Sequence, residues 1–284
     1  MNHSTSNRRD FLRRGFVLGA AGVALPCAAR ARENPVAAMP GFGLSLASYT
    51  FRKFDLAVTL GFTRRVGIDH ICLKSFHLEL DSPPEECSRV ATQCRTAGVP
   101  LWAGGVITMR TEEQVNQAFN YAKAAGMRCI VGVPYPEVLP LVERQVRSHN
   151  ISVAIHNHGP GDALYPLPQD ALRRIRELDP RIGVCIDVGH TTRIGGDVAD
   201  AIRACGARVL DVHLKDVTAA EPAAEEVEIG RGIIDIPGLL RALRTVGYRG
   251  YLSFEHEKDP DDPLPGLAES VGYVRGVLAV LDRA

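Results

Sequence analysis

The chain has 284 residues, of which 45% are hydrophobic and 23% charged, and this composition excludes extended disorder for most of its length. Thirty-three Lys and Arg balance thirty-three Asp and Glu, so the chain lacks the basic excess that holds nucleic acid non-specifically. Seven cysteines without a CxxC pair form neither a disulfide scaffold nor a cysteine zinc site, and we expect most of those beyond residue 38 to be buried thiols.

The first 38 residues have the pattern of an export signal. They carry six Arg against two acidic residues, a net charge of +4, which leaves −4 on the remainder. The pair Arg8-Arg9 precedes Phe-Leu, and an apolar stretch rich in Gly and Ala follows at 15–29. This arrangement resembles the twin-arginine signal, which is read by a receptor. The apolar stretch is short for a membrane span, so we expect export to the periplasm without stable membrane insertion after processing. A retained N-terminal anchor is the alternative.

Eight short apolar runs follow, rich in Val, Ile and Leu without strict alternation, as in strands buried on both faces. They lie at 43–47, 70–73, 100–106, 128–133, 151–155, 182–186, 208–214 and 250–254. Helical periodicity occurs between them at 112–125, 163–178, 198–205 and 237–246. Eight strands alternating with helices predict an α/β protein with one (β/α)8 TIM barrel over residues 41–284. A doubly wound open sheet is the alternative, although no GxGxxG follows the first run.

The last four runs each end in an imidazole or a carboxylate, at His156, Asp187, His213 and Glu255. The carboxyl ends of the strands of a TIM barrel meet at one face. A buried charged group is costly unless it is paired or bound to a metal. Two imidazoles and two carboxylates suit a divalent cation, for which we choose Mn²⁺ first and Zn²⁺, Co²⁺, Fe²⁺ or Mg²⁺ as alternatives. The other interpretation is four separately satisfied polar residues.

These strand ends carry a resemblance to a known family. The segments Asp187-x-x-His190, His213-x-Lys215-Asp216 and Phe-Glu255 resemble the sugar phosphate isomerase/epimerase family of xylose isomerase-like TIM barrels, over residues 41–282. That family typically holds a divalent metal with Glu, Asp, His and Glu from the last four strands. The resemblance implies that Asp187, His213 and Glu255 are metal ligands, that Glu255 is also the base, and that His190 contacts substrate.

The sequence departs from the family at the fifth run, which ends in His156-Asn157-His158 where many members have Glu. Neutral imidazole is a good metal ligand, so the metal site survives the exchange. Two-base epimerases use paired glutamates, and here His156 replaces one of them. We prefer His156 as the ligand; His158 is the alternative and otherwise a substrate contact.

Other residues near the expected strand ends are candidates for the reaction. His190 and Lys215 are candidate donors to substrate oxygens, and Lys74 and His77 are candidate acid or base groups. For Lys215 the alternative is a salt bridge to Asp211 or Asp216. Candidate substrate contacts are Tyr49, Arg52, Glu137, His158, Arg193, Glu228 and Arg231.

Three further features of the sequence concern the mouth of the expected barrel. The loop that contains Gly230-Arg231-Gly232 is expected to close the site, and residues 259–265 are expected to form a loop over the mouth. Trp102 and Phe51 either stack on an apolar sugar face or fill the core.

These features predict a metal-dependent isomerase or epimerase that acts by enediolate chemistry on a free sugar or sugar derivative. Export argues against a phosphorylated substrate. One alternative is a lyase or hydrolase of oxidised 3-keto glycosides, because β-elimination needs only one base and an acid for the leaving group. A sugar-binding barrel without catalysis is another. The charge of −4 and the lack of further ligand clusters argue against a nuclease and a nucleic-acid partner. A homo-oligomer is compatible with the sequence, but no motif establishes one.

Overall fold

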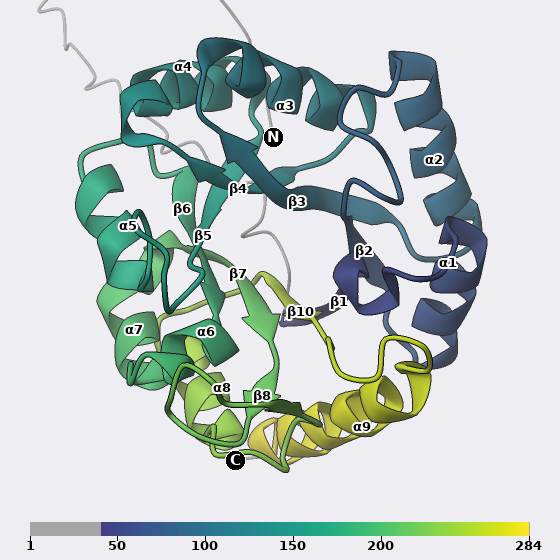
Figure 1. Ribbon diagram of the computed structural model, residues 1–284, viewed down its shortest axis with the longest axis vertical. Helices are drawn as coiled ribbons and strands as arrows, with labels where there is room; N and C mark the ends of the chain where they lie inside the picture. Colours follow the sequence, from purple (N-terminus) through teal and green to yellow (C-terminus); the bar gives the residue numbers. More distant parts are fainter. Residues whose placement is uncertain (1–40, 284) are drawn as a thin grey trace, which may run out of the picture. The chain divides into compact units, whose positions relative to one another are not determined.

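The computed structural model describes residues 41–283, and the expected export signal lies outside the described residues. Eight parallel strands close into a barrel in the order β1-β10-β7-β6-β5-β4-β3-β2 (Figure 1). The strands are β1 (Gly43–Ala47), β2 (His70–Leu73), β3 (Leu101–Met109), β4 (Cys129–Pro134), β5 (Ser152–His156), β6 (Ile182–Asp187), β7 (Val209–Leu214) and β10 (Tyr251–Phe254). The predicted TIM barrel is confirmed, and the open sheet is excluded.

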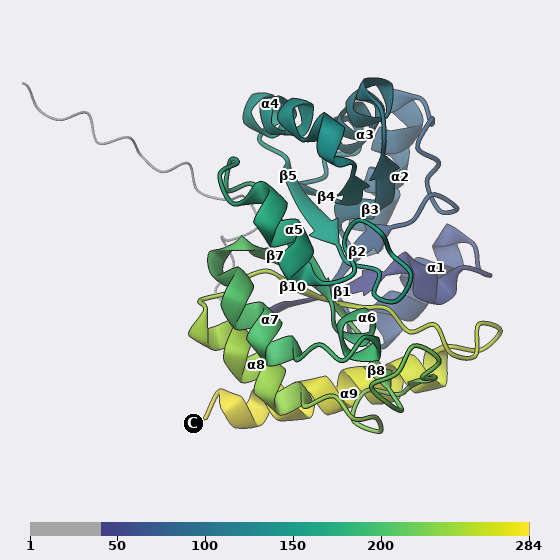
Figure 2. The ribbon, with the colours of Figure 1, turned by 60° about the vertical axis from the view of Figure 1, so that its left-hand side comes forward.

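Helices surround the strands in both views (Figures 1 and 2). The α-helices are α1 (Leu56–Arg65), α2 (Pro84–Thr96), α3 (Glu112–Ala124), α4 (Leu139–His149), α5 (Pro168–Ile175), α6 (Val188–Arg193), α7 (Val198–Cys205), α8 (Ile236–Thr245) and α9 (Leu264–Leu281). Short 3₁₀ helices are η1 (Ser48–Phe51), η2 (Pro136–Val138) and η3 (Gly206–Arg208). A small antiparallel pair, β8 (Asp216–Val217) and β9 (Glu226–Val227), follows β7.

Two sequence predictions about element bounds are wrong. The helix expected at 163–178 is shorter, because Pro168 occupies its first turn and Leu167 before it is extended. The loop expected at 259–265 ends where α9 begins, at Leu264. Within the described part of the chain, α9 has the length and mean hydropathy (1.3) of a membrane span, and its Leu267 side chain is buried.

Trp102 belongs to the barrel interior. It stacks on Tyr251 with ring centroids 4.3 Å apart, and its Nε1–H donates to Ser45 Oγ at 2.7 Å. Phe51 is fully buried and packs on Phe62. Of the two predicted roles, stacking on a sugar face or filling the core, both side chains therefore have the second. The six cysteines of the described residues are buried and free, as expected.

Candidate metal centre and active site

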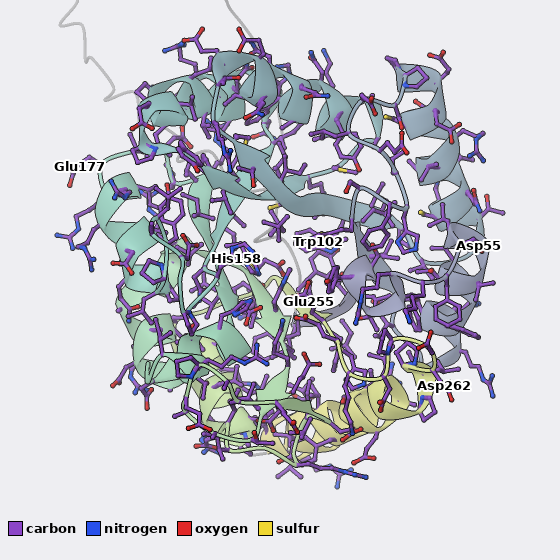
Figure 3. All side chains as sticks on the ribbon, in the orientation of Figure 1. Asp55, Trp102, His158, Glu177, Glu255 and Asp262 are labelled. Atoms are coloured by element: carbon purple, nitrogen blue, oxygen red, sulfur yellow. The ribbon has the colours of Figure 1, made fainter. Side chains whose placement is uncertain are left out.

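Four side chains converge at the carboxyl ends of β5, β6, β7 and β10: His156, Asp187, His213 and Glu255. One donor atom of each lies within 4.8 Å of the other three, and none of the four residues is more than 6% exposed. The parallel register places Asp187 directly beside His213. Continuous apolar runs bury these strands on both faces, so the polar residue that ends each run is held at the barrel axis. In Figure 3, Glu255 and His158 lie in the middle of the molecule, whereas Glu177 lies at its edge.

The spacing of the donor atoms fits a divalent cation. His156 Nε2 lies 3.2 Å from His213 Nδ1 and 3.5 Å from Asp187 Oδ2, and His213 Nδ1 lies 3.1 Å from Glu255 Oε2. A tetrahedral cation with ligand bonds of about 2.1 Å separates its ligands by about 3.4 Å. Hydrogen bonds alone satisfy this group poorly, because an Nδ1 that donates to Glu255 cannot also accept from His156. The four residues can therefore hold a metal ion.

Lys215 places a buried ammonium group against two of these carboxylates. Its Nζ lies 3.0 Å from Glu255 Oε2, 3.2 Å from Asp187 Oδ2 and 2.5 Å from Glu257 Oε1. Three carboxylates around one ammonium leave an excess of negative charge, which a divalent cation would balance.

The ionisation of three of the four residues suits metal ligation. The exception is His213, whose pKa burial alone would lower but Glu255 and Asp211 raise well above the ordinary value. Burial alone would raise the pKa of Asp187 and of Glu255, but the ammonium of Lys215 and the neighbouring imidazoles lower both pKa values well below the ordinary range. Burial lowers the pKa of His156 to about 3, so this imidazole is neutral. Ionised carboxylates and neutral imidazole are the forms that bind cations.

The interpretation that Lys215 pairs with Asp211 or Asp216 is wrong, because both carboxylates have other partners. Asp211 accepts a hydrogen bond from Ser253 Oγ at 2.9 Å. Asp216 is fully buried and holds the loop that follows β9.

The Asp216 carboxylate accepts four backbone hydrogen bonds, three of them from this loop and one from Val217 of β8. Oδ1 accepts from Val217 N (2.9 Å) and Ile234 N (3.1 Å), and Oδ2 accepts from Gly230 N (2.9 Å) and Gly232 N (3.0 Å). Gly230 has φ +95°, and a Cβ at Gly232 would collide with the carboxylate, so both positions require glycine. Sequence reasoning missed this role of Asp216. Its signal is an Asp next to the buried strand ends, followed by a loop with two closely spaced glycines.

Two further imidazoles lie beside the ligand group. The His156 ring centroid is 4.5 Å from that of His158 and 6.1 Å from that of His190. His158 follows the end of β5 and its side chain is 43% exposed, whereas His190 lies in α6 and donates its backbone N–H to Asp187 Oδ1 at 2.7 Å. The buried Nδ1 of His190 has no hydrogen-bond partner among the described residues. His190 therefore has a ring nitrogen available for a ligand.

Tyr49 brings two other candidate residues together near the same end of the barrel. The Arg52 guanidinium lies 4.7 Å from the Tyr49 ring centroid, and Lys74 Nζ lies 5.2 Å from it. Arg52 also donates to the backbone oxygen of Glu257 at 2.8 Å. Because Glu257 is a partner of Lys215, these residues border the ligand group. Sequence reasoning did not single out Glu257, although Glu257 lies only two residues after Glu255 in the same polar segment at a strand end.

The remaining candidates bind other parts of the protein. His77 Nε2 lies 3.0 Å from Phe54 O and 3.1 Å from Thr59 Oγ, so the ring is held against α1, and Glu137 is exposed on η2. The others have these partners: Arg193 donates to Ala224 O (3.1 Å), Glu228 accepts from Lys258 (2.8 Å), and Arg231 binds Glu269 of α9 through two hydrogen bonds (2.5 and 2.7 Å).

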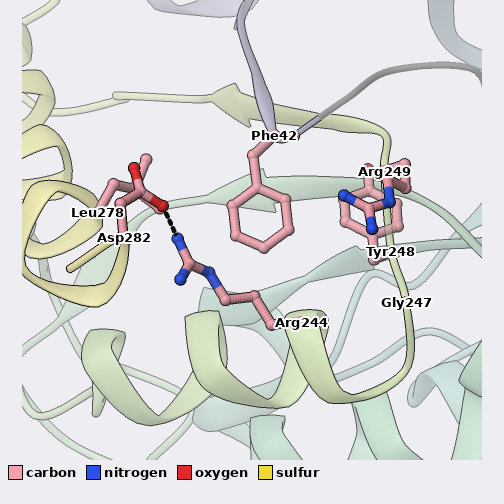
Figure 4. Close-up of a pocket in the computed structure, with 8 residues that line it drawn as sticks. Phe42, Arg244, Gly247, Tyr248, Arg249, Leu278 and Asp282 are labelled. Atoms are coloured by element: carbon pink, nitrogen blue, oxygen red, sulfur yellow. Dashed lines mark hydrogen bonds and ion pairs between the residues drawn. The ribbon is translucent and has the colours of Figure 1, made fainter. Parts of the chain in front are cut away.

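A separate pocket of about 490 Å³ lies at the opposite end of the barrel, next to the residues that precede β1 and β10 (Figure 4). Phe42, Tyr248 and Arg244 line it, and Arg244 is paired with Asp282. The amino-terminal face of a TIM barrel usually serves stability, so this pocket does not compete with the ligand group as the active site.

The structure is a closed (β/α)8 barrel with a buried His, Asp, His and Glu group at its carboxyl-terminal face. Residues 52–277 match the sequence profile of xylose isomerase-like TIM barrels, and the chain belongs to this family. The rhizopine catabolism protein MocC of Rhizobium meliloti is 26% identical over 154 residues, 49% of this chain. The match covers 47% of MocC, so the chain spans about half the length of that relative.

Solved structures with the same fold include three with named activities or ligands. An L-ribulose 3-epimerase superposes with TM-score 0.68 at 17% identity, covering 85% of this chain and 96% of that chain. The probable 3-DHS dehydratase AsbF of Bacillus anthracis gives TM-score 0.67 at 16% identity, covering 82% and 99%. The IOLI protein with a binding zinc atom gives 0.66 at 16%, covering 84% and 96%. At these identities the similarity establishes the fold.

Proposed function

We propose that this protein is a metal-dependent isomerase or epimerase that moves a proton next to a carbonyl group of a free sugar or sugar derivative. The observation that carries the proposal is the group of four buried donor atoms within 4.8 Å of one another. Membership of the xylose isomerase-like family supports a carbohydrate substrate, and the zinc in the IOLI structure supports a metal in this fold.

A divalent cation held by His156, Asp187, His213 and Glu255 would supply Lewis acidity to the substrate oxygens. Glu255 is the base that removes the proton, because Asp187 Oδ1 already caps α6 through the His190 N–H. Lys215 stays charged among its carboxylates, since their attraction outweighs the effect of burial and raises its pKa well above the ordinary value. The imidazole of His190 is the donor to the substrate oxygen that gains negative charge, and Lys215, whose three N–H groups already face carboxylates, adds a positive charge beside it.

A second candidate function is β-elimination from an oxidised 3-keto glycoside. His156 favours it, because a neutral imidazole stands where a two-base epimerase needs its second glutamate. Glu255 is then the single base, and elimination requires only one, with an acid for the leaving group. His190, with its unpartnered Nδ1, is the candidate acid.

The first test is the metal content of protein purified without a chelating tag, for the wild type, His156→Ala and Glu255→Ala. About one divalent ion per chain, lost in both variants, supports the site. Wild-type protein that takes up no ion, even with added Mn²⁺ or Zn²⁺, refutes the metal-dependent mechanism and favours a sugar-binding barrel.

The loaded enzyme is then incubated in D₂O with free sugars and with 3-keto glycosides, and the products are followed by NMR. A deuterated isomer or epimer supports the proposed isomerase. Release of the aglycone with an unsaturated sugar assigns the protein to the second candidate.

We also propose that the protein acts in the periplasm, on a substrate without a phosphate group. The twin-arginine pattern of residues 1–38 supports this location. Cell fractionation of the wild type beside an Arg8→Lys, Arg9→Lys double variant tests it. Cytoplasmic location of the wild-type protein would refute it.

A further inference from the structure

A second set of four side chains lies one layer below the ligand group. Successive side chains of a strand point to opposite faces, so the residue two positions before each ligand points the same way. These residues are Ala154, Cys185, Asp211 and Ser253, all fully buried. The register pairs Cys185 with Asp211 across β6 and β7. Among the four, Asp211 alone carries a carboxylate, and the function described above makes no use of it.

The two oxygens of Asp211 have different partners. Oδ1 accepts the hydroxyl of Ser253 at 2.9 Å. Oδ2 accepts the thiol of Cys185 at 3.6 Å and lies 3.4 Å from Nε2 of His213. A carboxylate without solvent is costly unless donors surround it, so an N–H on His213 Nε2 stabilises this position. Oδ2 is thus directed at the ring of a candidate metal ligand.

His213 presents one ring nitrogen to each layer. Nδ1 faces the ligand group, 3.2 Å from His156 Nε2 and 3.1 Å from Glu255 Oε2. Nε2 faces the layer below and has no hydrogen-bond partner of ordinary geometry among the described residues. Its distance of 3.4 Å from Asp211 Oδ2 exceeds a typical N–H···O bond by a few tenths of an ångström. A small shift of either side chain therefore completes the bond.

We propose that Asp211 is a positioning residue for the metal centre: it accepts a hydrogen bond from His213 Nε2–H and so holds the tautomer whose Nδ1 lone pair faces the cation. This inference rests on the proposed function. Without Asp211, an N–H of the His213 ring is better placed on Nδ1, where Glu255 accepts it, and Nδ1 then offers no lone pair to a cation. Loss of such a carboxylate partner typically weakens metal binding 10- to 100-fold.

Cys185 offers a second way to hold a cation, and the experiment must distinguish it from ligation by the four residues above. Its Sγ also lies within 4.8 Å of a nitrogen of His156 and of one of His213, so a softer ion seated one layer lower would use the thiolate. Ligation by sulfur would remove the thiol donor that Asp211 accepts. The inference therefore requires that Cys185 be dispensable for metal binding.

The experiment measures the Zn²⁺ dissociation constant by competition with a chromophoric chelator. Asp211→Asn is compared with Ser253→Ala, which removes a donor to Oδ1 and leaves His213 untouched, and with Cys185→Ala. We expect Asp211→Asn to raise the dissociation constant 10- to 100-fold and each control to change it less than threefold. Folding of each variant is checked by circular dichroism. An Asp211→Asn protein that folds and binds Zn²⁺ within threefold of the wild type overturns the inference, and so does loss of the ion in Cys185→Ala.

The tautomer is read directly in the wild type by ¹⁵N NMR of the histidine rings, with and without Zn²⁺. A proton on Nε2 of His213 in both samples is the expected result, and a bare Nε2 overturns the inference. This measurement decides the question even if Asp211→Asn does not fold. If the wild type binds no Zn²⁺ or Mn²⁺, the proposed function fails, and the tautomer in the metal-free protein still decides whether Asp211 holds the ring.

Discussion

Replacing Asp216 by Asn should loosen the loop of residues 228–234. The carboxylate accepts two backbone N–H groups on each oxygen. An amide has one oxygen, so whichever way Asn turns, two donors face its NH₂ group. Hydrogen bonds to a charged group contribute about 1.5–3 kcal/mol each, and two lost bonds therefore cost about 3–6 kcal/mol. Water that enters around Gly230, which is exposed, and Gly232, which is partly buried, recovers some of this, and we expect a loss of about 3 kcal/mol.

Urea unfolding measures this loss, and hydrogen exchange at the four donor amides, those of Val217, Gly230, Gly232 and Ile234, localises it. Asp235→Asn is the matched control, because Asp235 caps α8 through a hydrogen bond to Gly238 N and Asn is an equally good cap. The control should change stability by less than about 0.5 kcal/mol. Unchanged exchange at all four amides in Asp216→Asn would refute the argument that this carboxylate holds the loop.

Four further predictions follow from the contacts described. Lys215→Met leaves buried carboxylates without their cation, so the metal-free variant should lose about 3–5 kcal/mol in urea unfolding, and added Zn²⁺ should restore part of it. Chelator treatment of metal-loaded wild type should lower its melting temperature in calorimetry, whereas a chelator without effect argues against a bound ion. Hydrogen bonds from Arg181 lower the pKa of Asp179, so the ionised carboxylate stabilises the fold at pH values above its unfolded pKa of about 3.9. The loss of unfolding free energy caused by Asp179→Asn at pH 7 should therefore become smaller as the pH falls below about 4. Ser45→Ala leaves the buried Nε1–H of Trp102 unpaired and should cost about 1–3 kcal/mol in thermal unfolding, and an unchanged midpoint would contradict that bond.

The strands and the candidate metal ligands were accessible to sequence reasoning because both depend on local order along the chain. A run such as Ile182–Asp187 is apolar until its last residue, so the polar residue marks the strand end and its direction along the barrel axis. Parallel strands then bring four such ends together without any knowledge of side-chain conformation. The length of α5 was missed for the opposite reason, since a proline at its first turn overrides the periodicity before it.

The same reasoning did not predict the partners of long charged side chains, because these partners are distant in sequence. For Lys215 the sequence offered a substrate oxygen or, as the alternative, a neighbouring Asp as partner, but its Nζ reaches Glu255 and Glu257, 40 and 42 residues away. Arg231 binds Glu269, 38 residues away, through the same freedom. A four-carbon or guanidinium side chain spans several ångströms, so strand register does not fix where its charge lies.

The residues at positions 156 and 211 both affect the negative charge near the candidate metal ligands. The family resemblance implies Glu at position 156; His156 instead brings a neutral imidazole, so the ligand group has one negative charge fewer than the resemblance implies. Asp211 places a carboxylate one layer lower, 3.4 Å from the ring of His213 and shielded from water. At this distance and burial a negative charge on Asp211 makes the electrostatic potential at the ligand group more negative. If the four residues hold a cation as proposed, Asp211 adds an attraction that the neutral His156 does not supply, so the affinity for Zn²⁺ should depend on Asp211 more than on any other residue of the lower layer.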